Sequence, residues 1–231
     1  MCGRFTLRTP MAVLAQRFGI PETPVWEPRY NIAPTQPIAA IRGFQSNDVP
    51  LSDDRGLAWL RWGLVPNWAD DPKIGSRMIN ARSESVHEKP SFRTPFRKRR
   101  CVIPADGYYE WQTSAPVEGT QRAAAKRPFH FRRRDGEPFL MAGLWESRRR
   151  GDELLETCAL LTVGANALAA QYHDRMPVIL DEEGAHRWLD PDTPEARLRE
   201  LLVPADPEPM VAVEVSTRVN KPSIDDPSLL E

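Results

Sequence analysis

Strand-forming stretches in this chain are short, and this property most restricts the folds that are open to it. Each stretch ends within about ten residues at proline, glycine or a charged cluster, as at 37–44, 57–66 and 157–165. Short amphipathic stretches at 11–18 and 182–190 predict helices. Many short strands with few helices are typical of antiparallel barrels and sandwiches. We therefore predict an α+β fold: a single domain with a central curved, barrel-like antiparallel sheet and peripheral short helices.

Local signals predict where the chain turns. Asp135-Gly136 predicts a hairpin within 127–146, and Asp106-Gly107 predicts a turn between two further strands. The other expectations are helices at 81–90, 166–173 and 193–203, loops at 20–37 and 113–128, a domain over 1–224 and a disordered tail at 225–231.

Composition excludes several classes of protein. The 231 residues are 41% hydrophobic and 27% charged, as in ordinary globular chains, and no apolar run approaches the roughly 18 residues of a membrane span. The N-terminus carries no apolar signal region, so we expect no secretion and a cytoplasmic location. Three widely spaced cysteines argue against a disulfide framework or a zinc cage, and Cys101 and Cys158 are expected as small strand residues.

Charge is distributed unevenly along the chain. The net charge is −1, yet residues 93–150 carry 14 basic and 6 acidic side chains, a net +8, and residues 151–231 carry 6 and 17, a net −11. A basic middle segment is consistent with phosphate binding, while solvated charged faces explain it equally well.

The cysteine at position 2 is chemically special. If Met1 is removed, Cys2 carries an α-amine and a thiol on adjacent carbons, a pair that condenses with an aldehyde to a five-membered ring. Their ordinary pKa values, near 8 and 8.5, predict that both are partly nucleophilic at neutral pH.

Three further stretches carry polar groups in unusual places. NARSE places Asn80 within two residues of Arg82, and HDR places His173 beside an apolar strand. In GYYEW, Glu110 should face away from its neighbours Tyr109 and Trp111, because strand side chains alternate. Glu110 is therefore expected either to face solvent, or to lie in a semi-apolar pocket with a raised pKa suited to acid–base catalysis.

Together these segments resemble one family. MCGRF, RYNIAPTQ, WGLVPNWA, INARSE, CVIPADGYYEW, AGLWE and HDRMPVIL occur in the order found in the SOS response-associated peptidase (SRAP) family, over residues 2–220. The resemblance implies a barrel-like domain that shields abasic sites in single-stranded DNA through a thiazolidine crosslink at the N-terminal cysteine. The family name also implies a peptidase activity that removes Met1, and the Schiff base on the way to the thiazolidine would permit abasic-site lyase activity as a side reaction.

The resemblance assigns roles by position. The implied catalytic residues are Cys2, Asn80, Glu110 and His173, and the residues expected to bind DNA are Arg4, Arg82, Arg175, Trp68 and Trp111. No metal or organic cofactor is expected, and we also expect no membrane partner and a monomer. Three alternatives stay open: an N-terminal-nucleophile peptidase or amidohydrolase acting without DNA, a non-catalytic DNA-binding module, and a structural protein with no nucleic-acid partner.

Overall fold

The structure of the protein is a computed structural model, and it describes residues 2–20, 26–42, 56–113 and 126–231. The strands in these residues are β1 Phe5–Leu7, β2 Arg29–Ile32, β3 Pro37–Arg42, β4 Gly56–Trp62, β5 Asn80–Arg82, β6 Arg100–Ala105, β7 Gly107–Thr113, β8 Lys126–Arg133, β9 Phe139–Arg150, β10 Glu153–Gly164, β11 Arg175–Pro177, β12 Ile179–Leu180 and β13 Met210–Glu214. The helices are α1 Met11–Phe18, α2 Arg93–Lys98, α3 Glu182–Leu189 and α4 Glu195–Glu200, with 3-10 turns η1 Pro72–Arg77, η2 Ala169–Gln171, η3 Thr217–Asn220 and η4 Pro227–Leu230.

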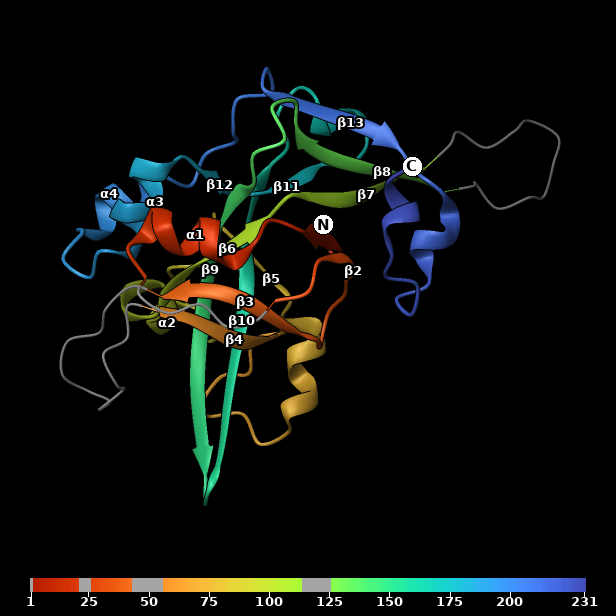
Figure 1. The fold of residues 1–231 in the computed structure, drawn as a ribbon. Helices are drawn as coiled ribbons and strands as arrows, with labels where there is room; N and C mark the ends of the chain where they lie inside the picture. Colours follow the sequence, from red (N-terminus) through yellow and green to blue (C-terminus); the bar gives the residue numbers. More distant parts are fainter. Residues whose placement is uncertain (1, 21–25, 43–55, 114–125) are drawn as a thin grey trace, which may run out of the picture.

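A closed barrel forms the centre of the fold. Strands β10, β4, β3, β6 and β9 pair in that order, and β9 pairs back onto β10. Most pairs are antiparallel, whereas β4 and β5 both run parallel to β10. The predicted α+β fold with a barrel-like sheet is confirmed, and the parallel pairs are an addition to it. Beyond the barrel, β9 and β10 continue as a long two-stranded arm (Figure 1).

A second sheet of five strands has the order β13-β8-β7-β1-β2. The chain passes from the barrel into this sheet between β6 and β7, where the amide of Asp106 donates to the carbonyl of Thr6 at 2.8 Å. Glycine is required at the next position, because a Cβ on Gly107 would lie 2.4 Å from the carbonyl oxygen of Phe131. This close approach brings β7 directly against β8.

The two faces of β7 have different neighbours. Tyr108 belongs to the main core with Cys2, whereas Tyr109 belongs to a smaller core with Val219 and Leu229 from the C-terminal segment. That segment lies beside the ends of β7 and β8 (Figure 1). The predicted alternation around Glu110 is therefore confirmed, since Tyr109 packs away from the main core.

Local sequence signals predict the positions of helices and turns correctly more often than they predict which strands pair. Helix α1 confirms the prediction at 11–18, and α3 covers 182–189. The hairpin predicted within 127–146 is wrong: Gly136 adopts a left-handed turn at φ 79°, but this turn links β8 in one sheet to β9 in the other.

Two predicted helices are also replaced by tighter turns. Residues 81 and 82 belong to β5 and residues 83–90 form turns after it, while the segment predicted at 166–173 contains only the 3-10 turn η2. Residues 114–125 of the predicted loop at 113–128, and Met1 itself, lie outside the described residues.

The C-terminal segment differs from the expected disordered tail. Leu229 is fully buried, and Asp225 accepts hydrogen bonds from the backbone amides of Tyr30 and Asn31. The difference arises because the residues that hold this segment are nearly 200 positions away in the sequence. Among the residues that the structure describes, none of the helices has the length and apolar character that crossing a bilayer requires.

Candidate active site at the N-terminal strand

Cys2 lies at the entrance to β1, which is flanked by β7 on one side and β2 on the other. Its side chain is fully buried, and its Sγ lies 3.8 Å from the carbonyl oxygen of Arg4. The first residues of a chain usually fray. Here β1 is paired on both sides, and this holds the short segment before it, which carries Cys2, in position.

Burial changes the chemistry of the Cys2 thiol. It raises the pKa of the thiol well above its ordinary value, and the nearby Glu110 carboxylate raises it further. The expectation of a partly deprotonated thiol at neutral pH is therefore wrong for this buried state. The thiol needs a base to accept its proton and a donor to stabilise the resulting charge.

Asn80 holds Cys2 from the barrel side. It begins β5, and its Nδ2 donates to the carbonyl oxygen of Cys2 at 2.7 Å. Its Oδ1 is buried and has no hydrogen-bond partner among the described residues. The amide thus fixes the backbone of Cys2 and presents an unused acceptor inside the site.

Glu110 supplies a buried carboxyl group. It lies on β7 and is only 4% exposed. Burial raises the pKa of the Glu110 carboxyl, and the opposing influence of His173 and of the Trp111 amide is weaker. A carboxyl that holds its proton at higher pH than usual is suited to exchanging protons during catalysis. The structure therefore brings together Cys2, Asn80, Glu110 and His173, as the motifs predicted.

His173 and Arg175 are ordered by their neighbours. The amide of Arg175 lies 3.0 Å from Nδ1 of His173, and the guanidinium of Arg175 makes a bidentate pair with Glu84. The same guanidinium donates to the carbonyl oxygen of Thr162 at 2.6 Å. The pairing of Arg175 with Glu84 joins the NARSE and HDR segments, a contact that neither motif predicts alone.

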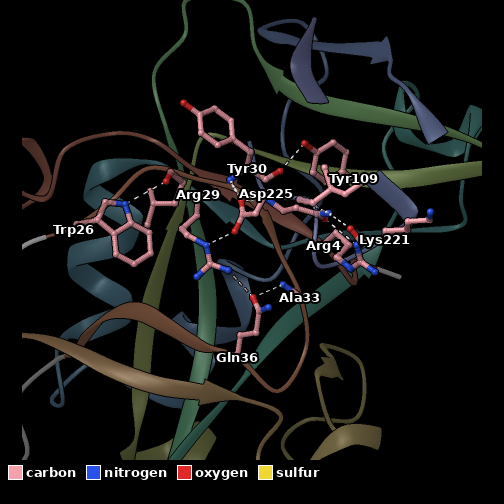
Figure 2. A network of polar contacts seen from close by, with 12 residues as sticks. Arg4, Trp26, Arg29, Tyr30, Ala33, Gln36, Tyr109, Lys221 and Asp225 are labelled. Atoms are coloured by element: carbon pink, nitrogen blue, oxygen red, sulfur yellow. Dashed lines mark hydrogen bonds and ion pairs between the residues drawn. The ribbon is translucent and has the colours of Figure 1, made fainter. Parts of the chain in front are cut away.

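Arg4 connects the site to the C-terminal segment. Its guanidinium donates to Oδ1 of Asn31 and to the carbonyl oxygen of Val219, both at 2.8 Å. Asn31 in turn donates to the carbonyls of Lys221 and Ile224. Figure 2 shows this network around Arg4 and its continuation to Asp225. The structure thus gives Arg4 internal partners beside Cys2.

The remaining residues expected to bind DNA have different surroundings. Arg82 is exposed and shares a face of β5 with Asn80, since the two are separated by one residue. Trp68 is 57% exposed and borders a cavity of about 180 Å³ that also includes Arg93. Trp111 donates to Oδ1 of Asn220 at 2.8 Å and packs on the C-terminal segment, away from the Cys2 cluster.

The uneven charge of the sequence is partly neutralised by folding. Arg97 of the basic segment pairs with Glu195 at 3.2 Å, and Arg127 pairs with Glu214 at 3.3 Å. Basic and acidic segments therefore contact each other. In the described part of the chain, no cluster of three or more histidine, cysteine, aspartate or glutamate side chains is placed to hold a metal ion.

One residue of the site escaped the sequence analysis. Tyr108 is fully buried, and its hydroxyl has no hydrogen-bond partner among the described residues. The signal was present in GYYEW, because Tyr108 is two positions from Glu110 and so shares its face of β7. An aromatic strand residue is ordinarily interpreted as part of the core, and the sequence does not reveal that this hydroxyl has no partner among the described residues.

The chain is also similar to known proteins over its whole length, and not only at the site formed by Cys2, Asn80, Glu110 and His173. The family described as SOS response associated peptidase (SRAP) matches residues 1–222. The chain belongs to this family.

Similar proteins come from bacteria and vertebrates. Abasic site processing protein YoqW of Bacillus subtilis is 41% identical over 237 residues, covering 100% of this chain and 99% of the relative. Abasic site processing protein HMCES of Gallus gallus is 33% identical over 271 residues, covering 100% and 77%. A crystal structure of a Bacteroides thetaiotaomicron protein superposes with a TM-score of 0.83 at 27% identity, covering 100% and 99% of the two chains.

Proposed function

We propose that this SRAP protein processes abasic sites in single-stranded DNA by forming a covalent crosslink through Cys2. The observation that carries the proposal is the burial of Cys2 beside the Asn80 amide and a carboxyl whose pKa burial raises, in a chain similar to abasic site processing proteins. The open-chain form of an abasic deoxyribose presents an aldehyde at C1′. An amine and a thiol on adjacent carbons are suited to capturing it.

The reaction requires two additions and one loss of water. After removal of Met1, the Cys2 amine adds to C1′, and the resulting carbinolamine loses its hydroxyl as water with a proton from Glu110. The Cys2 sulfur then attacks the iminium carbon, its proton passes to the Glu110 carboxylate, and the C=N electron pair returns to nitrogen. Glu110 ends in the protonation state in which it began, which a raised pKa favours.

The other polar groups orient the reactants. The unused Oδ1 of Asn80 accepts a hydrogen bond from the Cys2 amine, while its Nδ2 continues to hold the Cys2 carbonyl. His173 polarises the sugar hydroxyl as the deoxyribose ring opens. An iminium intermediate also permits β-elimination, so abasic-site lyase activity is proposed as a side reaction, and removal of Met1 as a peptidase activity of the same cluster.

The DNA-binding surface begins beside this cluster. Exposed Arg82, on the face of β5 that carries Asn80, contacts a phosphate next to the abasic site. The half-exposed ring of Trp68 offers a stacking surface for a base. Arg4 and Arg175 already have internal partners, and we assign them the role of holding Cys2 and His173 in position.

A denaturing gel tests the proposal. Protein whose intact mass shows the loss of Met1 is incubated with a single-stranded oligonucleotide that contains one abasic site. We expect a slowly migrating species whose mass equals protein plus DNA minus one water. It should be absent with undamaged DNA and with Cys2→Ala, and formed at least tenfold more slowly by Glu110→Gln.

Cys158→Ala is the matched control, because it removes another fully buried thiol that lies outside the cluster. It should crosslink like the unmodified protein. Absence of the covalent species, from folded protein without Met1, would refute the proposal. Cleavage of peptide or amide substrates by the same protein would then support the alternative of an N-terminal-nucleophile hydrolase.

A further inference from the structure

Tyr108 occupies a position in the core that a phenylalanine would fill equally well. Its ring stacks on Phe131 with centroids 4.9 Å apart and planes 9° apart, and it also contacts Phe139 at 6.2 Å. Its backbone pairs with Phe5 of β1, the strand that Cys2 precedes. These contacts account for the ring and its orientation, and none of them involves the hydroxyl.

The hydroxyl of Tyr108 is the unexplained part. It is buried and has no hydrogen-bond partner among the described residues, which costs free energy that phenylalanine would avoid. Buried polar groups are nearly always paired, so an exception of this kind calls for a reason. A hydroxyl that finds its partner only during a reaction is one such reason.

The surroundings indicate what that partner is. Tyr108 shares a core with Cys2 and shares a face of β7 with Glu110. Burial raises the pKa of the Tyr108 phenol, and negative charge on Cys2 and then on Glu110 raises it further. The phenol thus stays protonated and acts as a hydrogen-bond donor, close to the place where the sulfur becomes negatively charged.

We propose that Tyr108 is a further residue of the crosslinking reaction, whose hydroxyl donates a hydrogen bond to the Cys2 sulfur as the thiol loses its proton. This inference rests on the proposed function. The thiol proton passes to the Glu110 carboxylate, the Tyr108 hydroxyl stabilises the thiolate, and the sulfur then forms its bond to C1′ while the C=N pair returns to nitrogen. Tyr108 keeps its own proton throughout and is neither oxidised nor consumed.

Tyr108 acts only in ring closure, which is the second half of the reaction. Formation of the iminium uses the Cys2 amine and requires no charge on sulfur. Ring closure requires a thiolate in a buried site that otherwise disfavours it. A residue that merely supports the core would affect both halves equally, so measuring the two halves separately distinguishes the roles.

Tyr108→Phe is the decisive variant, because it removes the hydroxyl and retains the stacked ring. Iminium formation with abasic single-stranded DNA is measured as the crosslink that cyanoborohydride traps. Ring closure is measured as the stable crosslink that forms in the absence of this reductant. Both rates are followed between pH 6 and pH 9. We expect trapping rates within twofold of the unmodified protein. Ring closure should slow by about 10- to 100-fold at pH 7, the range that a hydrogen bond to a charged group supplies. The deficit should persist across this pH range, because burial keeps the pKa of the thiol above it in both proteins.

Tyr109→Phe provides the matched control. Its hydroxyl donates to the carbonyl oxygen of Tyr30 at 2.8 Å on the opposite face of β7, so this variant loses a hydrogen bond without changing ring closure. Tyr108→Phe should melt at the same temperature as the unmodified protein or higher, which verifies that it folds.

Equal ring-closure rates for Tyr108→Phe and the unmodified protein at every pH would overturn the inference and leave the proposed function intact. So would an equal slowing of both halves. Failure of the unmodified protein to crosslink at all would overturn both.

Discussion

Replacing Asp225 with alanine tests how the C-terminal segment is held. Its Oδ1 accepts from the amides of Tyr30 at 2.5 Å and Asn31 at 2.8 Å, and its Oδ2 pairs with the guanidinium of Arg29 (Figure 2). The Asp225 and Arg29 side chains are 18% and 27% exposed. The carboxylate therefore satisfies two amides of β2 in a largely dehydrated setting.

The expected loss follows from these contacts. A hydrogen bond to a charged group contributes about 1.5–3 kcal/mol, and removing the acceptor also leaves buried amides unpaired. Two such bonds at the lower end of that range, with about 1 kcal/mol for the partly buried ion pair, give a loss of about 4 kcal/mol. For a chain of this size, that lowers the melting temperature by about 8–16 °C.

Thermal and urea unfolding measure the loss directly. Asp226→Ala is the matched control: this neighbouring side chain is 46% exposed and caps η4 through the amide of Ser228 at 3.1 Å. Because this side chain faces solvent, losing the cap should cost clearly less than losing the contacts of Asp225. If Asp225→Ala were no more destabilising than Asp226→Ala, the view that Asp225 anchors the C-terminal segment would be refuted.

Three further outcomes are expected. Trp68→Ala should weaken binding to single-stranded DNA by about 1–3 kcal/mol in a fluorescence titration, with unchanged melting temperature, because the exposed ring stacks on a base. Arg82→Ala should weaken binding and reduce the slope of log K against log salt by about 0.7, the value for one lost phosphate contact on a single strand. Burial, with two neighbouring arginines, holds the pKa of His130 at about 3 in the folded protein, against about 6.5 when unfolded. The unfolded chain therefore binds the extra proton, and stability should fall by about 1.4 kcal/mol per pH unit below pH 6.5 down to about pH 3, a dependence that His130→Gln removes.

Controls make each outcome decisive. His186→Gln, at an exposed position, should leave the acid dependence of stability unchanged. Arg187→Ala, also at an exposed position, should leave the slope of log K against log salt unchanged. Each prediction would be contradicted by an unchanged result: the same loss of stability at low pH in His130→Gln, the same salt slope in Arg82→Ala, or the same DNA affinity in Trp68→Ala.

The residues of the candidate site were accessible from the sequence because each lies in a short motif with its own chemical character. Cys2 and Glu110 stand out by residue type, and the resemblance to the SRAP motifs singles out Asn80. Strand alternation correctly places Glu110 opposite Tyr109. The protonation state of Cys2 was not accessible, because it depends on burial by strands more than 100 residues away.

The errors in the fold have a common physical origin. The Asp135-Gly136 turn was located correctly, yet local turn chemistry does not reveal whether the strands on either side pair with each other. Asp225 was assigned to a disordered tail because its charge is satisfied only by β2, which lies far away in the sequence. Helix propensity at 81–90 was outweighed by turns that bury Val86.

The position of β1 imposes an order of events during synthesis. β1 can pair with β2 once residue 32 has been made, but its other neighbour is β7, whose pairing residue is Tyr108. At about 5–20 residues per second, several seconds separate the emergence of Cys2 from the completion of its surroundings. During that interval the segment around Cys2 is exposed to solvent. Cys2 is thus synthesised early and becomes buried only later, when β7 pairs with β1.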